Sequence, residues 1–114
     1  MVDTDARSVA IRYVDSWTSG DLDTTRTLLH DDVTFVGPLG TAEGIADCLK
    51  GLEGLVKIVK SADRRHAFAD GEDACVIYDL NTEGATLPTS GWFKVIDGRI
   101  SAIRVFFDPR PLFG

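Results

Sequence analysis

The sequence is poor in the features that mark several large classes of protein. Its 114 residues contain two cysteines and two histidines, and no apolar run approaches the roughly 20 residues that cross a membrane. Cys48 and Cys75 lack CxxC spacing and fall on different expected elements, which favours reduced thiols over a disulfide. Two histidines without ligand spacing predict no metal site, and no cofactor is expected.

Positive charge is also scarce. Twelve Lys and Arg against eighteen Asp and Glu give 12 − 18 = −6, a field that repels polyanions, so a nucleic acid partner is not expected. The first five residues are acidic where a signal peptide is basic and then apolar. We therefore expect a soluble, cytoplasmic protein that has no membrane partner.

Apolar residues make up 44% of the chain, which is enough for a hydrophobic core. The length of 114 residues predicts one domain, spanning residues 1–114. Apolar residues at helical spacing predict a helix over 5–18, which Ser19-Gly20 ends. Asp21 is the expected N-cap of a short second helix that ends before Asp31. A long third helix is expected from Thr41 or Ala42 to about Val59, weakened by two glycines.

The remaining segments have the alternation of strands. A first strand is expected over 33–36, and two hairpins over 65–80 and 91–107, with turns at 70–72 and 97–98. Pro109 and Pro111 end the regular structure. The order α-α-β-α-β-β-β-β predicts an α+β fold, with three helices on one face of a curved, mostly antiparallel sheet.

Several segments, taken in order, resemble one known family. They are Arg12-Tyr13-Val14, Ser19 to Asp23, Leu28 to Phe35, Gly44-Ile45, Ala69 to Glu72 and Asp97 to Ile100. The resemblance covers nearly the whole chain and is to the SnoaL-like branch of the nuclear transport factor two superfamily. It implies a cone that encloses one apolar pocket. Isomerases, epoxide hydrolases, polyketide cyclases and non-catalytic binders share this cone, so the fold does not fix the function.

Two groups of relatives offer tests at single residues. Tyr13 matches the oxyanion-hole tyrosine of ketosteroid isomerases, but their general base falls at Gly37 and their second oxyanion acid at Gly91. Steroid isomerisation therefore lacks its proton acceptor. The catalytic carboxylate of limonene-type epoxide hydrolases falls at Val105, so their activation of water is unsupported as well.

With the resemblance choosing the concave face, period two sorts the strand residues. The inward set is Val76, Tyr78, Leu80, Phe93, Val95, Ile103, Val105 and Phe107. The outward set includes Phe68, Cys75, Ile77, Trp92 and Phe106, with Asp79 and Arg104 among them. An outer face this apolar is expected to be covered by a second copy, which makes a homodimer.

The candidates for chemistry are Tyr13, His66, and Asp79 together with Asn81. Tyr13 could donate a hydrogen bond to a ligand oxygen, or could be a core tyrosine bonded to a backbone carbonyl. His66 suits a general base, but parity places it on the outer face. A bulge could swing Asp79 and Asn81 into the pocket as acid or base.

Other charged residues have structural readings beside the functional ones. Arg65 is expected to point inward, where it needs a carboxylate or an anionic ligand, although a slip of one residue returns it to solvent. Asp31 and Asp32 could be paired carboxylates or caps of a turn. The basic cluster of Lys57, Lys60, Arg64 and Arg65 fits a solvated helix end or an anion site.

The sequence thus predicts a small hydrophobic ligand in the cone pocket, closed by the aromatic tail from Phe106 to Phe113. The enzyme hypothesis is a cofactor-free cyclase, isomerase or hydrolase of polyketide or terpenoid type; the alternative is a binding or dimerisation module without turnover. The predicted pocket residues are Tyr13, Trp17, Phe35, Gly37, Tyr78, Leu80, Phe93, Val105 and Phe107.

Overall fold

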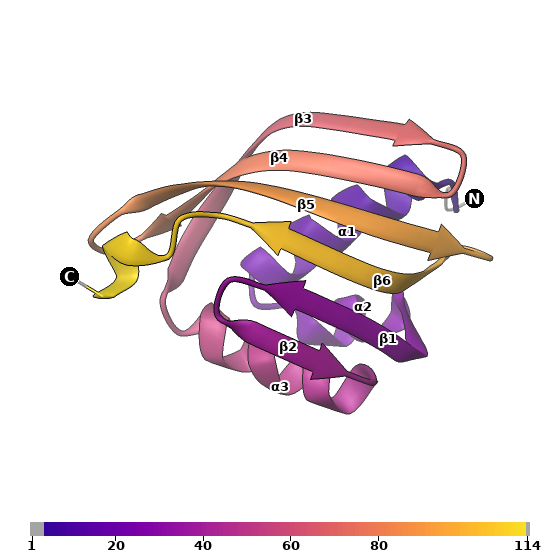
Figure 1. Cartoon of the computed structure of the whole chain (residues 1–114), viewed down its shortest axis with the longest axis horizontal. Coiled ribbons are helices and arrows are strands. Elements are labelled where there is room, and N and C mark those ends of the chain that lie inside the picture. Colours follow the sequence, from indigo (N-terminus) through magenta and orange to yellow (C-terminus); the bar gives the residue numbers. More distant parts are fainter. Residues whose placement is uncertain (1–3, 114) are drawn as a thin grey trace.

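In the computed structural model, which describes residues 4–113, a curved six-stranded sheet arches over the helices on one of its faces (Figure 1). The helices are α1 (Ala6–Thr18), α2 (Leu22–Thr27) and α3 (Ile45–Val56). The strands are β1 (Leu29–Gly37), β2 (Gly40–Glu43), β3 (Val59–Asp70), β4 (Asp73–Thr82), β5 (Thr86–Ile96) and β6 (Arg99–Phe106), and the short 3-10 helix η1 (Arg110–Phe113) follows. The predicted α+β cone is confirmed.

The sheet order is β2-β1-β6-β5-β4-β3. All neighbours are antiparallel except β1 and β6, which run parallel. The last strand of the sheet therefore lies beside the first, and it joins the β1-β2 hairpin to the long antiparallel run of β3, β4 and β5.

An aspartate caps each of the two N-terminal helices, and the predicted cap at Asp21 is confirmed. The Asp5 carboxylate accepts a hydrogen bond from the Ser8 amide at 3.2 Å, and that of Asp21 accepts one from the Thr24 amide at 3.2 Å. Such side chains satisfy amide groups that the first turn leaves without a partner.

Several predicted boundaries are wrong. The expected third helix begins at Ile45, because Gly40–Glu43 pairs with β1 as strand β2. Four residues are too few to show a period of two. The Gly44 amide bonds to the Val33 carbonyl at 2.7 Å, and its positive φ of 86° turns the chain into the helix.

The other errors extend strands. β3 begins at Val59 rather than at Arg65, β5 begins at Thr86 rather than at Gly91, and β1 begins at Leu29, which was assigned to the second helix. Pro88 lies within β5, opposite Asp79, and a proline in a strand removes a backbone donor, so the alternation looks broken there.

Two bulges decide which way side chains point. The pairing between β3 and β4 shifts between Arg64 and His66, and that between β5 and β6 shifts where Ser101 is inserted. The first bulge corrects the inward prediction for Arg65, which is exposed and pairs with Asp79 at 2.8 Å. The second lets both Ile100 and Ile103 face the core.

The core fills the space between the concave face and the helices. The fully buried side chains include Val9, Tyr13 and Val14 of α1, Val76 and Tyr78 of β4, and Phe93, Ile100 and Ile103 of β5 and β6. No helix within residues 4–113 is both long enough and apolar enough to cross a membrane.

Candidate functional site

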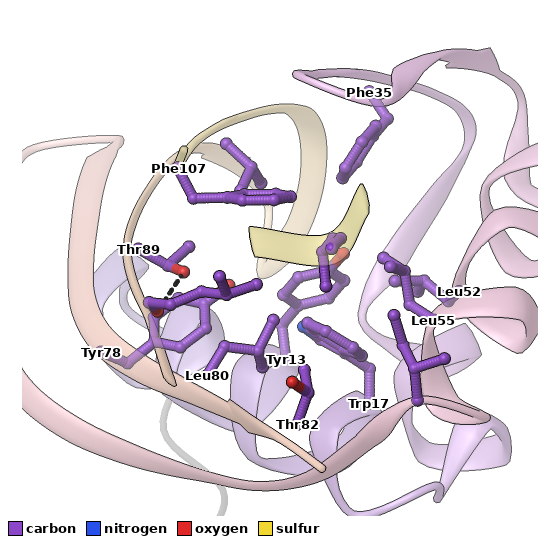
Figure 2. Close-up of a pocket in the computed structure, with 14 residues that line it drawn as sticks. Tyr13, Trp17, Phe35, Leu52, Leu55, Tyr78, Leu80, Thr82, Thr89 and Phe107 are labelled. Carbon is purple, nitrogen blue, oxygen red and sulfur yellow. Dashed lines mark hydrogen bonds between the residues drawn. The ribbon is translucent and has the colours of Figure 1, made fainter. Parts of the chain in front are cut away.

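A small cavity lies inside the cone, under the arch of the sheet (Figure 2). Its volume is about 30 Å³, which is about the room that one water molecule takes in the liquid. Its lining is almost wholly apolar and consists of Tyr13, Trp17, Phe35, Leu52, Leu55, Ile58, Tyr78, Leu80, Thr82, Leu87, Thr89, Val105, Phe107 and Leu112. As it stands, the cavity is too small for a ligand of ten carbons or more.

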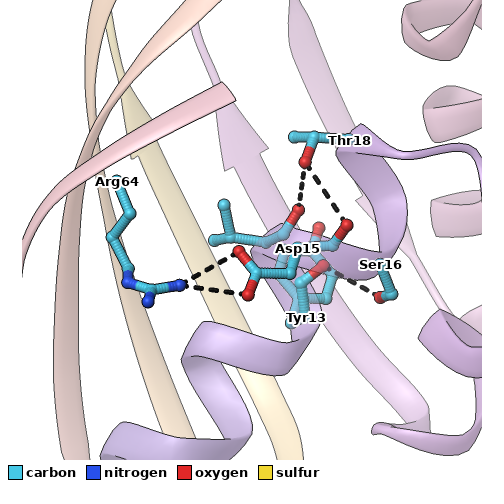
Figure 3. Close-up of polar contacts among 6 residues, drawn as sticks. Tyr13, Asp15, Ser16, Thr18 and Arg64 are labelled. Carbon is cyan, nitrogen blue, oxygen red and sulfur yellow. Dashed lines mark hydrogen bonds and ion pairs between the residues drawn. The ribbon is translucent and has the colours of Figure 1, made fainter. Parts of the chain in front are cut away.

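Tyr13 reaches this cavity from α1, whose position is fixed by polar contacts on its far side. The Ser16 hydroxyl donates to the Tyr13 carbonyl at 3.0 Å and lies 2.7 Å from the buried Thr25 hydroxyl. One guanidinium nitrogen of Arg64, on β3, donates to both oxygens of Asp15, at 3.0 and 3.2 Å (Figure 3). Helix α1 is therefore held to both α2 and β3.

The two tyrosines of the chain, Tyr13 and Tyr78, both border the cavity. Each is 2% exposed, and within residues 4–113 neither hydroxyl forms a hydrogen bond. Burial raises the pKa of both, and the nearby Tyr78 raises that of Tyr13 further. Both hydroxyls thus stay protonated at neutral pH and keep a hydrogen to donate. Neither hydroxyl oxygen is fully enclosed, so each is open to a water molecule or a ligand oxygen that would complete its hydrogen bonding.

Phenyl rings lie against the two glycines that match the general base and the oxyanion acid of ketosteroid isomerases. A Cβ added at Gly91 would lie 2.8 Å from the Phe93 ring, and one added at Gly37 would lie 3.0 Å from the Phe35 ring. Both rings belong to the residue two positions away on the same strand face. A carboxylate at Gly91 would need Phe93 to move.

Phe93 itself is fully buried behind Tyr13, with ring centroids 5.3 Å apart in an edge-to-face contact. It does not border the cavity, and neither does Gly37, which corrects the predicted lining at those two positions. The other predicted lining residues do border it. Phe93 sets the position of the Tyr13 ring from behind.

The predicted proton-moving residues lie elsewhere. Asp79 is on the outer side of the sheet, where its carboxylate accepts from the Arg65 Nε at 2.9 Å, and His66 is exposed and stacks on Phe68 at 5.9 Å. Asn81 donates to Asp63 and Ser61 on β3. The cavity therefore has no carboxylate or imidazole among residues 4–113.

The remaining charged candidates are dispersed. His30 lies on β1, and its Nε2 is 2.9 Å from the Ile96 carbonyl oxygen. Asp31 and Asp32 are both exposed on β1. Arg64 and Arg65 of the basic cluster pair with Asp15 and Asp79. Within residues 4–113, no three His, Cys, Asp or Glu residues are grouped so that they could hold a metal ion.

The C-terminal tail closes one end of the cavity in part. Phe107 and Leu112 border it, whereas Phe106 and Phe113 are exposed, at 60% and 77%. Asp108 receives three hydrogen bonds from the Arg110 side chain. These bonds, together with one from the Arg110 amide, lower the pKa of Asp108 to about 2. The tail therefore has an exposed ion pair between Asp108 and Arg110, while Leu112 of η1 faces the cavity.

Sequence patterns miss the part of the lining that α3 and β5 supply. Leu52, Leu55 and Ile58 follow the helical spacing, but periodicity marks them only as core. Leu87 and Thr89 lie in the part of β5 that precedes the hairpin predicted over 91–107, so strand parity was not applied to them. Cys48, one turn before Leu52, is a free, buried thiol, and burial raises its pKa to about 11.

Comparison with known proteins gives one family and several similar structures. Residues 10–103 match the SnoaL-like domain. A protein from Kribbella flavida is 28% identical with a TM-score of 0.91, covering 97% of this chain and 93% of that one. An NTF2-like protein of unknown function from Cytophaga hutchinsonii is 29% identical with a TM-score of 0.83, covering 100% and 97%.

Among curated proteins, a similar segment occurs in the ECF RNA polymerase sigma factor SigJ of Mycobacterium tuberculosis. The two are 32% identical over an alignment of 98 residues, and the match covers 82% of this chain and 31% of that protein. This chain thus spans about a third of the relative's length.

Proposed function

We propose that this protein, which belongs to the SnoaL-like domain family, binds a small apolar molecule that carries a carbonyl or hydroxyl oxygen. The observation that carries the proposal is the pair of buried tyrosines, Tyr13 and Tyr78, which border an apolar cavity and whose hydroxyls have no hydrogen bond within residues 4–113. A ligand oxygen between them would accept the hydrogens that the protein leaves unused. Each such bond contributes about 1 kcal/mol.

We propose binding without turnover as the role of this site. General acid–base catalysis works best with a group whose pKa lies near the working pH, and the titratable groups that border the cavity are two tyrosines with raised pKa values. The rings of Phe35 and Phe93 lie against Gly37 and Gly91, the positions that match the general base and the oxyanion acid of ketosteroid isomerases. The similar segment in a sigma factor also fits a binding module better than a catalyst.

The enzyme hypothesis keeps one supporting feature, because Tyr13 stands where it could polarise a ligand carbonyl. In that alternative the proton is moved by a group outside the cavity lining. The two roles predict different behaviour for the same ligand, so one pair of compounds separates them.

The test uses 2-acetylnaphthalene and 2-ethylnaphthalene, which match in shape and differ in the ketone oxygen. Fluorescence of Trp17, which borders the cavity, reports binding in a Trp92→Phe background. We expect wild-type protein to prefer the ketone, and Tyr13→Phe and Tyr78→Phe each to reduce that preference by about fivefold, for one lost hydrogen bond. Equal affinity for both compounds would mean that the hydroxyls serve only a trapped water.

Turnover is tested on the same ketone. In deuterated water, a catalyst that polarises the carbonyl and removes a proton speeds exchange of the acetyl hydrogens, which proton NMR measures. We expect the buffer rate. A faster rate that disappears in Tyr13→Phe would favour the enzyme hypothesis.

We further propose that a second copy of the chain covers the outer face of the sheet. Register places Phe68, Cys75, Trp92, Arg104 and Val36 in one row across five strands, and Ile77 and Phe106 lie in the adjacent row. Phe68 is 57% exposed, and exposed apolar patches of this kind mark interaction sites. Two like faces can meet about a two-fold axis.

A further inference from the structure

A second hollow lies outside the cone, between β2 and α3. It has a volume of about 630 Å³, within the roughly 300 to 1,000 Å³ of sites that hold small molecules. We call it the α3 groove, and its lining is Phe35, Leu39, Gly40, Thr41, Ala42, Asp47, Cys48, Lys50, Gly51, Leu52, Gly54, Leu55 and Ile58.

The α3 groove and the inner cavity share a wall. Phe35, Leu52, Leu55 and Ile58 border both hollows, and Figure 2 shows Phe35, Leu52 and Leu55 on the α3 side of the inner cavity. Phe35 is half-buried and Ile58 is 44% exposed. These four side chains form the shared boundary, so their rotation is the movement that would join the two hollows.

The floor of the α3 groove contains two glycines that the fold does not require. Glycine in a helix interior costs about 1 kcal/mol relative to alanine. Gly51 and Gly54 do not have the positive φ that favours glycine, and a Cβ added at either would meet nothing within 4 Å. Neither backbone conformation nor packing within the chain therefore explains them, whereas a molecule lying on the bare helix would.

Charge in the α3 groove is confined to two side chains. Asp47 and Lys50 are both exposed, and one Asp47 oxygen accepts from the Glu43 amide at 3.1 Å. The two charges cancel formally, so the groove favours a neutral occupant. Its remaining walls are mainly apolar, which suits a flat hydrocarbon body.

We propose that the α3 groove holds the apolar body of the ligand whose oxygen bonds to Tyr13 and Tyr78. The inference rests on the proposed function and adds the shape of the ligand: a neutral, flat, elongated molecule with its oxygen at one end. The inner cavity of about 30 Å³ receives the oxygen, and the groove of about 630 Å³ receives the rest. Phe35, Leu52, Leu55 and Ile58 form the boundary that the ligand crosses.

The test fills the groove without disturbing the fold. Gly54→Ala and Gly54→Leu add side chains into open space and favour the helix, so the melting temperature should rise or stay constant. Glu53→Leu is the matched control, because Glu53 is exposed on the same helix and borders neither hollow. The probe is prodan, a neutral naphthalene with a ketone at one end and a dimethylamino group at the other.

We expect prodan to bind wild-type protein and the Glu53→Leu variant alike, with blue-shifted emission. Gly54→Ala should weaken binding severalfold, and Gly54→Leu by about tenfold or more, a change of about 1.4 kcal/mol. The smaller 2-acetylnaphthalene should lose less affinity than prodan in both variants. A graded loss with side-chain size would support the groove as the place of the ligand body.

The outcomes separate this inference from the proposed function. If Gly54→Leu binds prodan like wild type while Tyr13→Phe still lowers the ketone preference, the groove proposal is overturned and the proposed function stands. If wild type shows no preference for 2-acetylnaphthalene, the proposed function fails whatever the groove variants do. A change of mass by light scattering in Gly54→Leu would show that a second copy occupies the groove, which also overturns the proposal.

Discussion

The two faces of the sheet are built from the same strands, yet they differ in what completes them. One of the two tryptophans lies on each side of the sheet: Trp17 of α1 borders the inner cavity, whereas Trp92, half-buried on the outer face, donates to Asp73 at 3.1 Å. Along β4, Val76, Tyr78 and Leu80 are buried inside, while Ile77 and Asp79 alternate with them outside. The helices of the chain cover only the first set.

The difference shows that alternation alone does not separate core from surface. Inward residues are buried because α1 and α3 pack on them, whereas Phe68, Ile77 and Phe106 on the outer face remain exposed in the isolated chain. Ion pairs such as Arg65 with Asp79 and Lys94 with Asp73 lie among these apolar side chains. The outer face therefore combines a mainly apolar row, which Arg104 interrupts, with ion pairs such as these.

The largest contrast is expected in the stability of the fold. Phe93→Ala should lower the free energy of unfolding by about 3–5 kcal/mol, because it leaves a cavity behind Tyr13. Phe68→Ala, at 57% exposure, should cost less than about 1 kcal/mol in the monomer. Urea denaturation at low protein concentration measures both. Similar losses of unfolding free energy in the two variants would contradict the difference in packing between the inner and outer faces.

The next largest effect concerns the oligomeric state. Trp92→Glu would place an unpaired charge in the proposed interface, at a cost of several kcal/mol, so we expect it to convert dimers to monomers in light scattering. In wild type, Cys75 should react slowly with a thiol reagent and in the variant rapidly. A monomeric wild type would contradict the proposed dimer.

A smaller effect is expected at alkaline pH. The pKa of both tyrosines is raised above the ordinary 10.0 by burial, so their contribution to stability is complete below about pH 10 and is lost as the pH rises above it. Absorbance of tyrosinate at 295 nm reports this site alone, because the chain has two tyrosines. We expect it to appear only with unfolding, and the alkaline loss of stability to shrink in the variant with both tyrosines changed to Phe. Tyrosinate at pH 10 in the folded protein would contradict the buried pair.

The smallest effect is expected for Asp79→Asn. The carboxylate pairs with Arg65 on the outer face, and exposed pairs contribute little. Affinity for 2-acetylnaphthalene should change by less than about twofold, as for His66→Gln. A strong loss of affinity in Asp79→Asn alone would place the carboxylate at the ligand, as the enzyme hypothesis requires.

Much of the fold could be predicted from the sequence, because its signals are local. The cap at Asp21, the Asp97-Gly98 turn and the alternation along β4 each depend on residues close in sequence. Strand β2 and the start of β5 could not, because four residues show no period and Pro88 interrupts one. The bulge at Arg65 arises from the pairing of β3 with β4, and the sequence of one strand alone does not determine its register with the other.

The site was predictable in the part that helix spacing and strand parity define, which includes Leu80 and Val105 beside the aromatic residues. Tyr13, Tyr78 and Trp17 follow from helix spacing and strand parity, so they fall on the expected face. The size of the cavity does not follow, since it depends on how Phe107 and Leu112 of the tail pack against Leu52 and Leu55 of α3. The α3 groove could not be predicted either, because it lies between α3 and β2, and the sequence predicts most of β2 as the start of that helix.

The parallel pairing of β1 with β6 has a consequence for how the chain assembles. β6 lies between β1 and β5, and the Ile100 amide bonds to the Leu28 carbonyl at 2.8 Å. Strands β3, β4 and β5 can pair as they leave the ribosome, because each follows its neighbour in sequence. The β1-β2 hairpin can join this sheet only after residues 99–106, which form β6, have emerged. Such long-range closure is slow, so the last strand should set the folding rate, and until it arrives the nascent chain has two open sheet edges for chaperones to shield.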